Sequence, residues 1–412
     1  MNTVWGLALA ALSNEARAVL DILATLDPDG VLEDLLIGDW SEPELDFLHP
    51  SKHFDLLALY QTWEPKIEPV FAFATLLLDT ANYLWEKGLT KEGMETMQIG
   101  EDVCVQLSNI PEVIPIHANI CAIAGGVHAE IGFSGRAMAR QKCELALDLR
   151  KRRVRELEQS GTVASDDSML LANAWNDVGV VRIQNEEFEE AVPCLQESLR
   201  LKNKWESEDK IPWHFGETYK NLSFTHLSRG DFKKAKEFAH RSYNLCSRGM
   251  AEKSAATQKA KFILATILLN CGDIEEALML HKEILIARQE IFGKAHGLTK
   301  DSLYNVGEVY RQQGGKLEKA EAKFREALED CKAWPPEAIA RAQYHLALVI
   351  NEFTDRLTFS RKMEAAQLEE EARQLRERLD PSSVSNTPEA NLRLHDFMVS
   401  LWAGRTGLVK EI

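Results

Sequence analysis

Two histidines stand four positions apart in the run HPSKH, at His49 and His53, with Asp46 and Asp55 close by. On a helix this spacing places both imidazoles on one face, and imidazoles with a carboxylate are common zinc ligands. Pro50 follows His49 directly, however, and a proline disfavours the helical conformation of the residue before it. We therefore predict no metal site here, and no cofactor elsewhere in the chain.

Other patterns that carry chemistry are absent from the sequence. It contains no GxSxG, no HExxH, no GxGxxG after a strand, and no GxxxxGK[ST] loop that would cradle a nucleotide phosphate. Histidines such as His226 and His281 stand at apolar helical positions, which is typical of packed side chains. We predict no catalytic residue, although a Cys and a His that are distant in sequence can still meet in space.

Composition restricts the possible partners and the compartment. The formal charge of −16 opposes phosphate backbones and anionic membranes, so we expect neither nucleic acid nor a membrane as partner. The seven cysteines are scattered without a CxxC pair, which indicates buried free thiols in a reducing compartment. No stretch approaches the ~20 apolar residues of a membrane span. The predicted location is the cytoplasm.

Small residues recur along the chain at positions where helices must cross closely. Residues 174–199 predict two helices joined by a turn at Asn185, with Gly179 on the first helix and Ala191 on the second. A larger side chain at either position would force the helices apart. The Ala191 position recurs, at intervals of 42 to 52 residues, at Gly93, Ala139, Ala235, Ala277 and Ala320. Such self-similarity predicts a repeat array of long helix pairs.

One unit, residues 293–328, carries a more specific pattern, in which Gly293, His296, Asn305 and Gly307 stand at characteristic places. It resembles the long tetratricopeptide repeats of kinesin light chains, although Gly297 stands where that family usually has a proline. The resemblance implies an all-α fold. We expect a right-handed α-solenoid of six to seven long tetratricopeptide-type helix pairs, with an N-terminal helical segment and C-terminal capping helices.

The resemblance also implies a binding groove, because the first helix of each pair lines the concave face of such a solenoid. Groove asparagines of that family hold the main chain of a peptide, and Asn221 and Asn305 are the best matches here. Asn176, in the unit before that of Asn221, is one residue out of register. Ile263 occupies the equivalent position of the unit between those of Asn221 and Asn305. Further candidate contacts for a partner are Lys220, Phe224, Phe262, Tyr304 and Arg311.

Aromatic residues permit two interpretations. Residues 211–216 (IPWHFG) are predicted to form a loop, in which Trp213 and Phe215 either pack beneath the chain or project as anchors for a partner. Trp213 is therefore a candidate contact as well. Alternatively, these two residues line a closed apolar pocket for a small molecule together with Phe224, Phe262 and Tyr304.

The two ends of the chain resemble parts of fungal NB-ARC- or NACHT-type signalling ATPases. The similar stretches are residues 3–37 and residues 394–405, LHDFMVSLWAGR. Because the phosphate loop is missing, the chain resembles the repeat or sensor half of such a protein standing alone. The final helix, through Leu401 and Trp402, is expected to dock back as a lid. The predicted divisions are 1–65 (helical, winged-helix-like), 66–380 (solenoid), 381–391 (linker) and 392–412 (capping helix and tail).

Three hypotheses about function follow. The first is a protein–protein interaction scaffold that binds a peptide or protein partner in the concave groove, without catalysis of its own. The second is a fungal accessory enzyme of secondary metabolism that uses the groove as an apolar pocket for a small molecule. The third is a regulatory partner of a signalling ATPase.

Overall fold

The structure is a computed structural model that describes residues 71–86, 90–250, 254–353, 358–383, 387–406 and 408. The chain divides into two compact units, Met1–Val70 and Phe71–Ile412, and every described residue belongs to the second. The predicted N-terminal segment, residues 1–65, lies outside the described residues together with His49 and His53.

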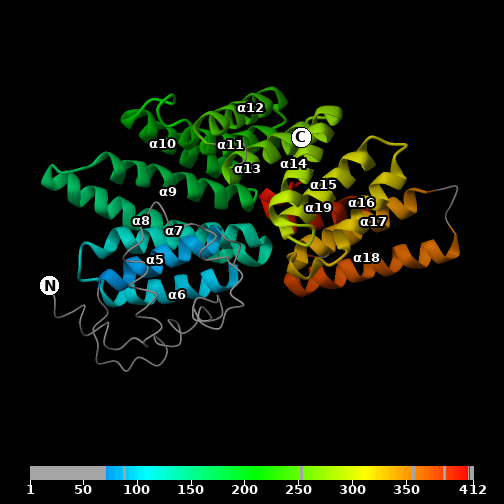
Figure 1. The fold of residues 1–412 in the computed structure, drawn as a ribbon, viewed down its shortest axis with the longest axis horizontal. Helices are drawn as coiled ribbons and strands as arrows, with labels where there is room; N and C mark the ends of the chain where they lie inside the picture. Colours follow the sequence, from blue (N-terminus) through cyan, green and yellow to red (C-terminus); the bar gives the residue numbers. More distant parts are fainter. Residues whose placement is uncertain are drawn as a thin grey trace, which may run out of the picture. The chain divides into compact units, whose positions relative to one another are not determined.

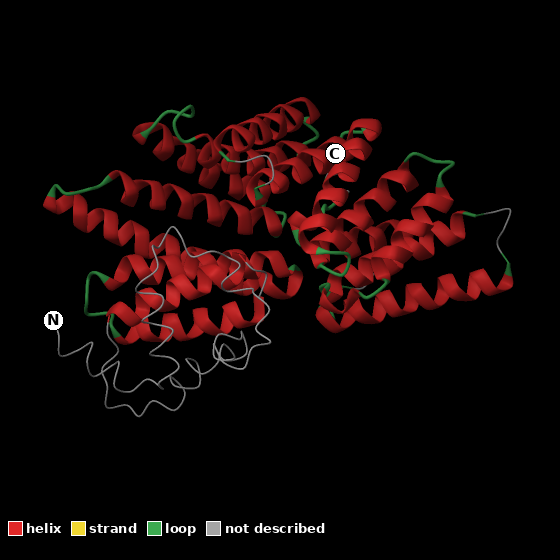
Figure 2. Cartoon of the chain, viewed as in Figure 1, coloured by secondary structure: helices red, strands yellow, loops and turns green. Residues whose placement is uncertain are grey.

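The described residues form fifteen α-helices and no strand, which confirms the all-α fold class (Figure 2). Fourteen of the helices make seven consecutive pairs. The first helices of the pairs are α5 (Phe71–Glu86), α7 (Val113–Ile131), α9 (Ser165–Gln184), α11 (Pro212–Ser228), α13 (Ala255–Asn270), α15 (Gly297–Gln312) and α17 (Pro336–Glu352). The second helices are α6 (Thr90–Gln106), α8 (Arg136–Ser160), α10 (Phe188–Trp205), α12 (Phe232–Gly249), α14 (Ile274–Phe292), α16 (Leu317–Leu328) and α18 (Phe359–Leu379).

The helices form two layers. Each first helix packs on its own second helix, and each second helix packs on the next first helix (Figure 1). First helices also pack on one another, α5 on α7, α7 on α9, α9 on α11, α11 on α13 and α15 on α17. The first helices therefore make the inner layer of a solenoid, as the repeat pattern predicts.

The small residues lie at helix crossings, as expected. A Cβ atom on Gly179 would lie 2.6 Å from Leu195 Cδ2, and one on Gly307 would lie 3.0 Å from Phe324 Cε1. Ala191, Ala277 and Ala320 are fully buried. Small side chains thus let the two helices of a pair approach, and the large apolar residues of the second helix fill the remaining space.

The array curves until distant pairs touch. Ser134, in the 3₁₀ turn η3 (Phe133–Gly135) between α7 and α8, donates its hydroxyl to Glu337 Oε1 of α17 at 2.6 Å. Lys259 of α13 pairs with Glu130 of α7 at 2.8 Å. Helix pairs that are distant in the sequence are therefore in direct contact on the inner side of the array.

Two local predictions are wrong. Residues 211–216 are not a loop, because Pro212 occupies the first turn of α11, where its fixed φ favours a helix start. The last helix, α19 (Pro388–Met398), ends before Leu401, and a short 3₁₀ turn, η6 (Leu401–Ala403), follows it. Gly404 then adopts a left-handed conformation with φ of 78°.

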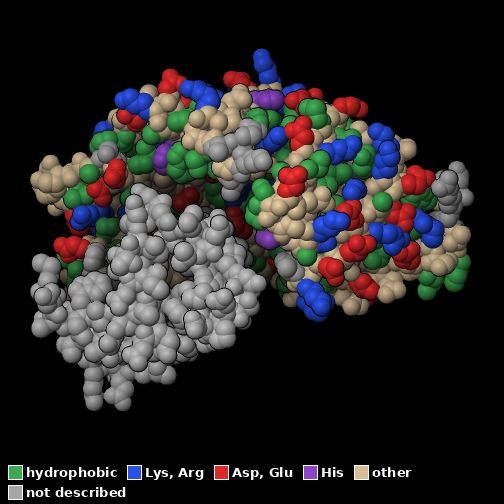
Figure 3. Space-filling model, viewed as in Figure 1, with side chains coloured by type: hydrophobic (Ala, Val, Ile, Leu, Met, Phe, Trp, Pro, Cys, Tyr) green, Lys and Arg blue, Asp and Glu red, His purple; other side chains and the backbone are tan. Residues whose placement is uncertain are grey.

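Charged side chains of both signs are interspersed over the described part of the face that Figure 3 shows. Within the described residues, no helix combines the length and the apolar character needed to cross a bilayer. All seven cysteines are free, and five of them are buried, in agreement with the sequence interpretation.

Candidate partner-binding groove

The inner layer surrounds the chain's own C-terminal segment. We call residues 396–405 the tail; it comprises the end of α19, the linking residues Val399 and Ser400, the η6 turn and the two residues after that turn. Its polar and aromatic contacts reach six successive first helices, α7, α9, α11, α13, α15 and α17. Figure 1 shows this red end of the chain among the green and yellow helices. The concave side of the solenoid is therefore occupied.

Groove side chains hold the main chain of the tail. Asn305 donates to the carbonyl oxygen of Ala403 at 3.0 Å, and Arg341 donates to the same oxygen at 2.9 Å. Asn270 donates to the carbonyl of Arg405 at 3.1 Å. These bonds do not depend on the side chains of the tail, so they form the general part of the recognition.

The first part of the tail is anchored on α7, α8 and α9. Ser400 donates its hydroxyl to the Ala129 carbonyl at 3.1 Å, and the Leu401 amide donates to Gln184 Oε1 at 2.9 Å. Arg136, at the start of α8, donates to the carbonyls of Phe397 and Val399. The guanidinium carbon of Arg136 lies 4.1 Å from the centroid of the Phe397 ring. The start of α8, the end of α9 and the inner face of α7 thus all contact the same short segment.

Arg405 is fully buried in a site made mainly of neutral acceptors. Its guanidinium donates to Gln184 Oε1 at 3.0 Å, to the Gln184 carbonyl at 3.1 Å and to the Val399 carbonyl at 2.8 Å. The carboxylate of Glu186 is 3.9 Å away, beyond hydrogen-bonding distance. Burial accordingly lowers the pKa of Arg405 to about 10, because the charged form loses its hydration.

Trp402 lies between two cationic side chains. The ammonium of Lys220 is 5.0 Å from the indole centroid, and that of Lys259 is 4.8 Å away. Phe224 contacts the same indole at a centroid distance of 6.1 Å. The electron-rich face of an indole attracts such cations, so this position is selective for an aromatic residue.

A buried polar network lies beside the tail. The Tyr304 hydroxyl is 3.0 Å from His345 Nε2, His345 Nδ1 is 2.8 Å from Glu308, and Arg311 donates twice to Glu308. His345 and Arg311 hold the pKa of Glu308 far below its usual range, even though burial alone would raise it. Arg341 connects this network to the tail, because its guanidinium lies 3.8 Å from the Tyr304 ring centroid and donates to Asp396.

Tyrosine, histidine and glutamate in contact resemble a catalytic relay, but the burial argues against that role. Tyr304 and His345 are fully inaccessible to solvent, and Glu308 is 1% exposed. A reacting molecule must come within hydrogen-bonding distance of a catalytic group. We therefore interpret this network as the rigid base on which the tail rests.

The structure brings some of the predicted site residues together and separates others. Asn305, Lys220 and Phe224 contact the tail directly. Tyr304 and Arg311 belong to the network beside it. Asn221 donates to Asn176 Oδ1 at 2.9 Å, so these two asparagines pair with each other instead of with the tail. The remaining two candidates, Phe262 and Trp213, contact His281 and His214, respectively.

The contacts of the aromatic residues do not outline a small-molecule pocket. Phe215, Phe262 and Tyr304 are fully buried and contact the rings of Tyr219, His281 and Phe324, respectively. Phe224 is also fully buried and lies against Trp402 of the tail. Apolar core and tail atoms therefore surround the rings that the pocket hypothesis needs.

Sequence reasoning missed several residues that hold the tail, namely Gln184, Arg341, Arg136 and the tail's own Gly404 and Arg405. The available signals in the sequence were Gln184 at the end of the mostly apolar stretch 178–183 and the run WAGR at residues 402–405. Neither signal indicates which distant helices the run would contact.

Two other sites were assessed. Among the described residues, Glu101, His117 and Cys121 place potential metal ligands within 4.8 Å of one another. The ammonium of Lys142 already pairs with Glu101, however, and would repel a cation.

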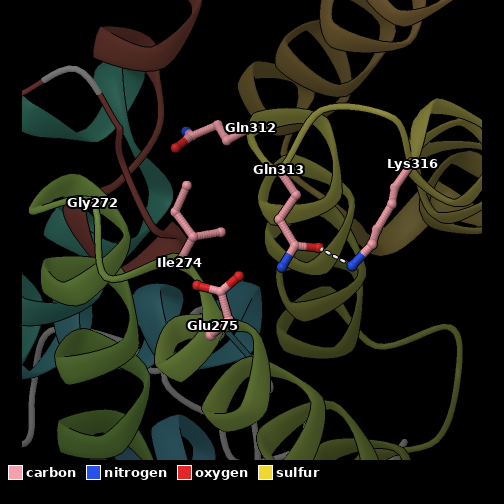
Figure 4. A pocket seen from close by; sticks show the side chains of 6 residues that line it. All are labelled: Gly272, Ile274, Glu275, Gln312, Gln313 and Lys316. Carbon is pink, nitrogen blue, oxygen red and sulfur yellow. Dashed lines mark hydrogen bonds between the residues drawn. The ribbon is translucent and has the colours of Figure 1, made fainter.

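A cavity of about 220 Å³ lies between the α13–α14 turn and the α15–α16 turn. It is lined by Gly272, Ile274, Glu275, Gln312, Gln313 and Lys316 (Figure 4). Lys316 donates to Gln313 at its rim, and we assign this cavity no function.

Comparison with known proteins agrees with the repeat interpretation. Residues 254–333, which contain α13 to α16, match the family model described as tetratricopeptide repeat. No curated protein sequence matches the chain significantly.

Three solved structures show a similar course of the chain. BtubC (BKLC) from P. vanneervenii is 17% identical, with a TM-score of 0.46 over 60% of this chain and 94% of that chain. A putative kinesin light chain repeat protein from Podosopora anserina is 16% identical, with a TM-score of 0.40 over 51% of this chain and 97% of that chain. A Rap protein complexed with competence and sporulation factor is 11% identical, with a TM-score of 0.48 over 73% of this chain and 77% of that chain.

Proposed function

We propose that the protein is an interaction scaffold whose inner helices hold a short peptide segment of a partner protein. One observation carries this proposal. Asn270, Asn305 and Arg341, on three successive first helices, bind main-chain carbonyls of the tail. Side chains that bind carbonyl oxygens recognise the main chain of a segment that presents its carbonyls at a suitable spacing, and these bonds do not depend on its side chains.

Binding, and not catalysis, suits the surroundings of these residues. The groups that would have to move a proton, Tyr304, His345 and Glu308, are buried beside the tail. The side chains that contact the tail are mainly amides and guanidiniums. Amides do not titrate, and an arginine keeps its proton at neutral pH, so such groups bind strongly and transfer protons poorly.

The location and lineage stay proposals. Seven free thiols suit a reducing compartment, and we propose the cytoplasm. The likeness to the sensor half of fungal signalling ATPases rests partly on residues 3–37, which lie outside the described residues.

A displayed library of random peptides, selected on the full chain, tests the proposal. We expect enriched peptides whose affinity falls about tenfold in Asn270→Ala, because each loses a main-chain hydrogen bond to a half-buried amide. Asn203→Ala is the matched control, since Asn203 is an exposed residue of α10 that bonds within its own helix. Selected peptides that bind Asn270→Ala and the unmodified chain equally would contradict the proposed groove.

A further inference from the structure

The tail lies where a bound partner segment would lie if the proposed function is right, and the inference below rests on that function. We propose that residues 396–405 are an internal occupant of the partner site, and that the partner displaces them with a segment of the same pattern. That pattern is Trp-x-Gly-Arg, as in Trp402, Gly404 and Arg405. The tail therefore both blocks the groove and shows which peptide chemistry the groove accepts.

The glycine position is the strictest part of the pattern. Gly404 has φ of 78°, a conformation that residues with a side chain rarely adopt. A Cβ atom at this position would also overlap the side-chain amide of Asn305. Asn305 cannot give way freely, because its amide nitrogen is held by the carbonyls of Asp301 and Ala403. A partner segment must therefore place glycine here.

The arginine position selects by geometry. The guanidinium of Arg405 reaches two acceptors on Gln184 and folds back to the Val399 carbonyl of its own segment. A lysine ammonium is a single point donor and cannot span these acceptors in the same way. The aromatic position is set by Lys220 and Lys259, whose ammonium groups both lie near the Trp402 ring.

The tail contributes Val399, Leu401 and Ala403 to the main apolar core, but its charged contacts are costly to bury. Docking of the tail buries the charges of Arg405 and Asp396 and covers Arg341 and Arg136. Burial raises the pKa of Asp396 to about 7, although Arg341 donates to it at 3.1 Å. Desolvation of such groups offsets much of what their bonds contribute, so the net stabilisation is smaller than the number of contacts suggests.

The connection to the solenoid also permits exchange. Helix α18 ends at Leu379 and α19 begins at Pro388, so only the short segment between them joins α19 and the tail to the last helix pair. A cut in this segment breaks the covalent link of α19 and the tail to the solenoid without touching any groove residue, and leaves only the packing of α19 on α17 and α18 to be overcome. This provides a clean test on the full, folded chain.

The experiment places a specific protease site between Asp380 and Thr387 and cuts the chain after folding. The probe is a fluorescein-labelled peptide of residues 399–408, followed by fluorescence anisotropy. We expect weak binding to the uncut chain, and at least about tenfold tighter binding once the released fragment has been removed, because the internal competitor is gone. A Gly404→Ala chain, left uncut, should show the same gain because its tail no longer fits.

Probe variants test the pattern. Gly404→Ala and Arg405→Lys in the peptide should each weaken binding by about tenfold or more, because each spoils a buried contact. Thr406→Ala is the matched control and should leave the affinity unchanged, since Thr406 lies beyond the Trp-x-Gly-Arg pattern and is only half-buried.

Each alternative outcome decides against the proposal in a different way. If the cut chain unfolds when the fragment leaves, the tail is a permanent part of the core. If selected library peptides lack Trp-x-Gly-Arg yet lose affinity in Asn270→Ala, the scaffold function stands and this inference is wrong. If the fragment leaves a folded chain that binds neither the probe nor any selected peptide, the proposed function is wrong as well.

Discussion

The crossing between the two helices of a pair and the contact between tail and groove are both buried, but they are built from different chemistry. Within a pair, Gly307 faces Phe324, and Ala320 is buried among apolar neighbours. Around the tail, Val399 and Leu401 also pack into the apolar core, but here amides and guanidiniums bind carbonyl oxygens and full charges lie out of water. Apolar packing stabilises without directional demands, whereas a polar contact is selective and contributes less net free energy. The first interface suits a permanent structure, and the second suits a recognition site.

The largest effect should come from removing a large side chain at a helix crossing. Phe324 is fully buried against Tyr304 and His345. Phe324→Ala should lower the free energy of unfolding by about 4 kcal/mol, because it removes apolar contacts and leaves a cavity. Urea denaturation measures this loss. Phe359→Ala is the matched control, since Phe359 is 81% exposed and its removal should change stability little. Equal effects of the two substitutions would show that the crossing is not well packed.

Acid should weaken the helix pairs through a buried histidine. His281 is fully buried against Phe262, and burial lowers its pKa to about 3. Below pH 6.5 the unfolded chain binds a proton that the folded chain excludes, so the free energy of unfolding falls as the pH drops. This group alone should account for about 3 kcal/mol between pH 7 and pH 4.

A substitution separates this contribution from the rest of the acid response. His281→Leu should flatten the dependence of the unfolding midpoint on pH between 7 and 4, measured in urea at each pH. Asn244→Leu on α12 serves as the control and should leave the dependence unchanged, because Asn244 is exposed and carries no titratable group. A variant with the unaltered pH response would show that His281 takes up its proton in the folded chain.

A smaller effect is expected at the tail. Arg405→Ala should cost about 1–2 kcal/mol, because the lost hydrogen bonds are partly offset by relief from a buried charge. Hydrogen exchange should become faster at the amide of Leu401, which donates to Gln184. Arg393→Ala is the control, since the Arg393 side chain is 56% exposed and pairs with Glu186 only at 3.5 Å. Unchanged exchange at Leu401 would mean that Arg405 does not hold the tail in place.

The smallest effect should occur on the outer surface. Arg373 of α18 pairs with Glu370 and Glu377, three and four residues away on the same helix. Water and salt screen such exposed pairs, so Arg373→Ala should leave the melting temperature unchanged within the error of a thermal scan. A clear drop would mean that surface pairs contribute to the array and would weaken the contrast between its two buried interfaces.

Much of the inner face was predictable, and the occupant was not. The positions of Asn305, Lys220 and Phe224 follow from the repeat, because each stands at a fixed place on a first helix. Gln184 and Arg341 were missed because their role depends on a segment far away in the chain. The sequence pattern also failed to predict the helix start at Pro212, because residues 211–216 combine a proline with aromatic side chains, which suggested a loop.

The sequence by itself determined the helix pairs, their order and their close crossings, because these depend on residues a few turns apart and on the size of small side chains. Only the tertiary structure decided what fills the groove. The bond from Asn305 to Ala403 joins residues 98 positions apart, and the bond from Ser400 to Ala129 joins residues 271 apart. No periodicity records such contacts, because they depend on how far the whole array curves before its last segment turns inward.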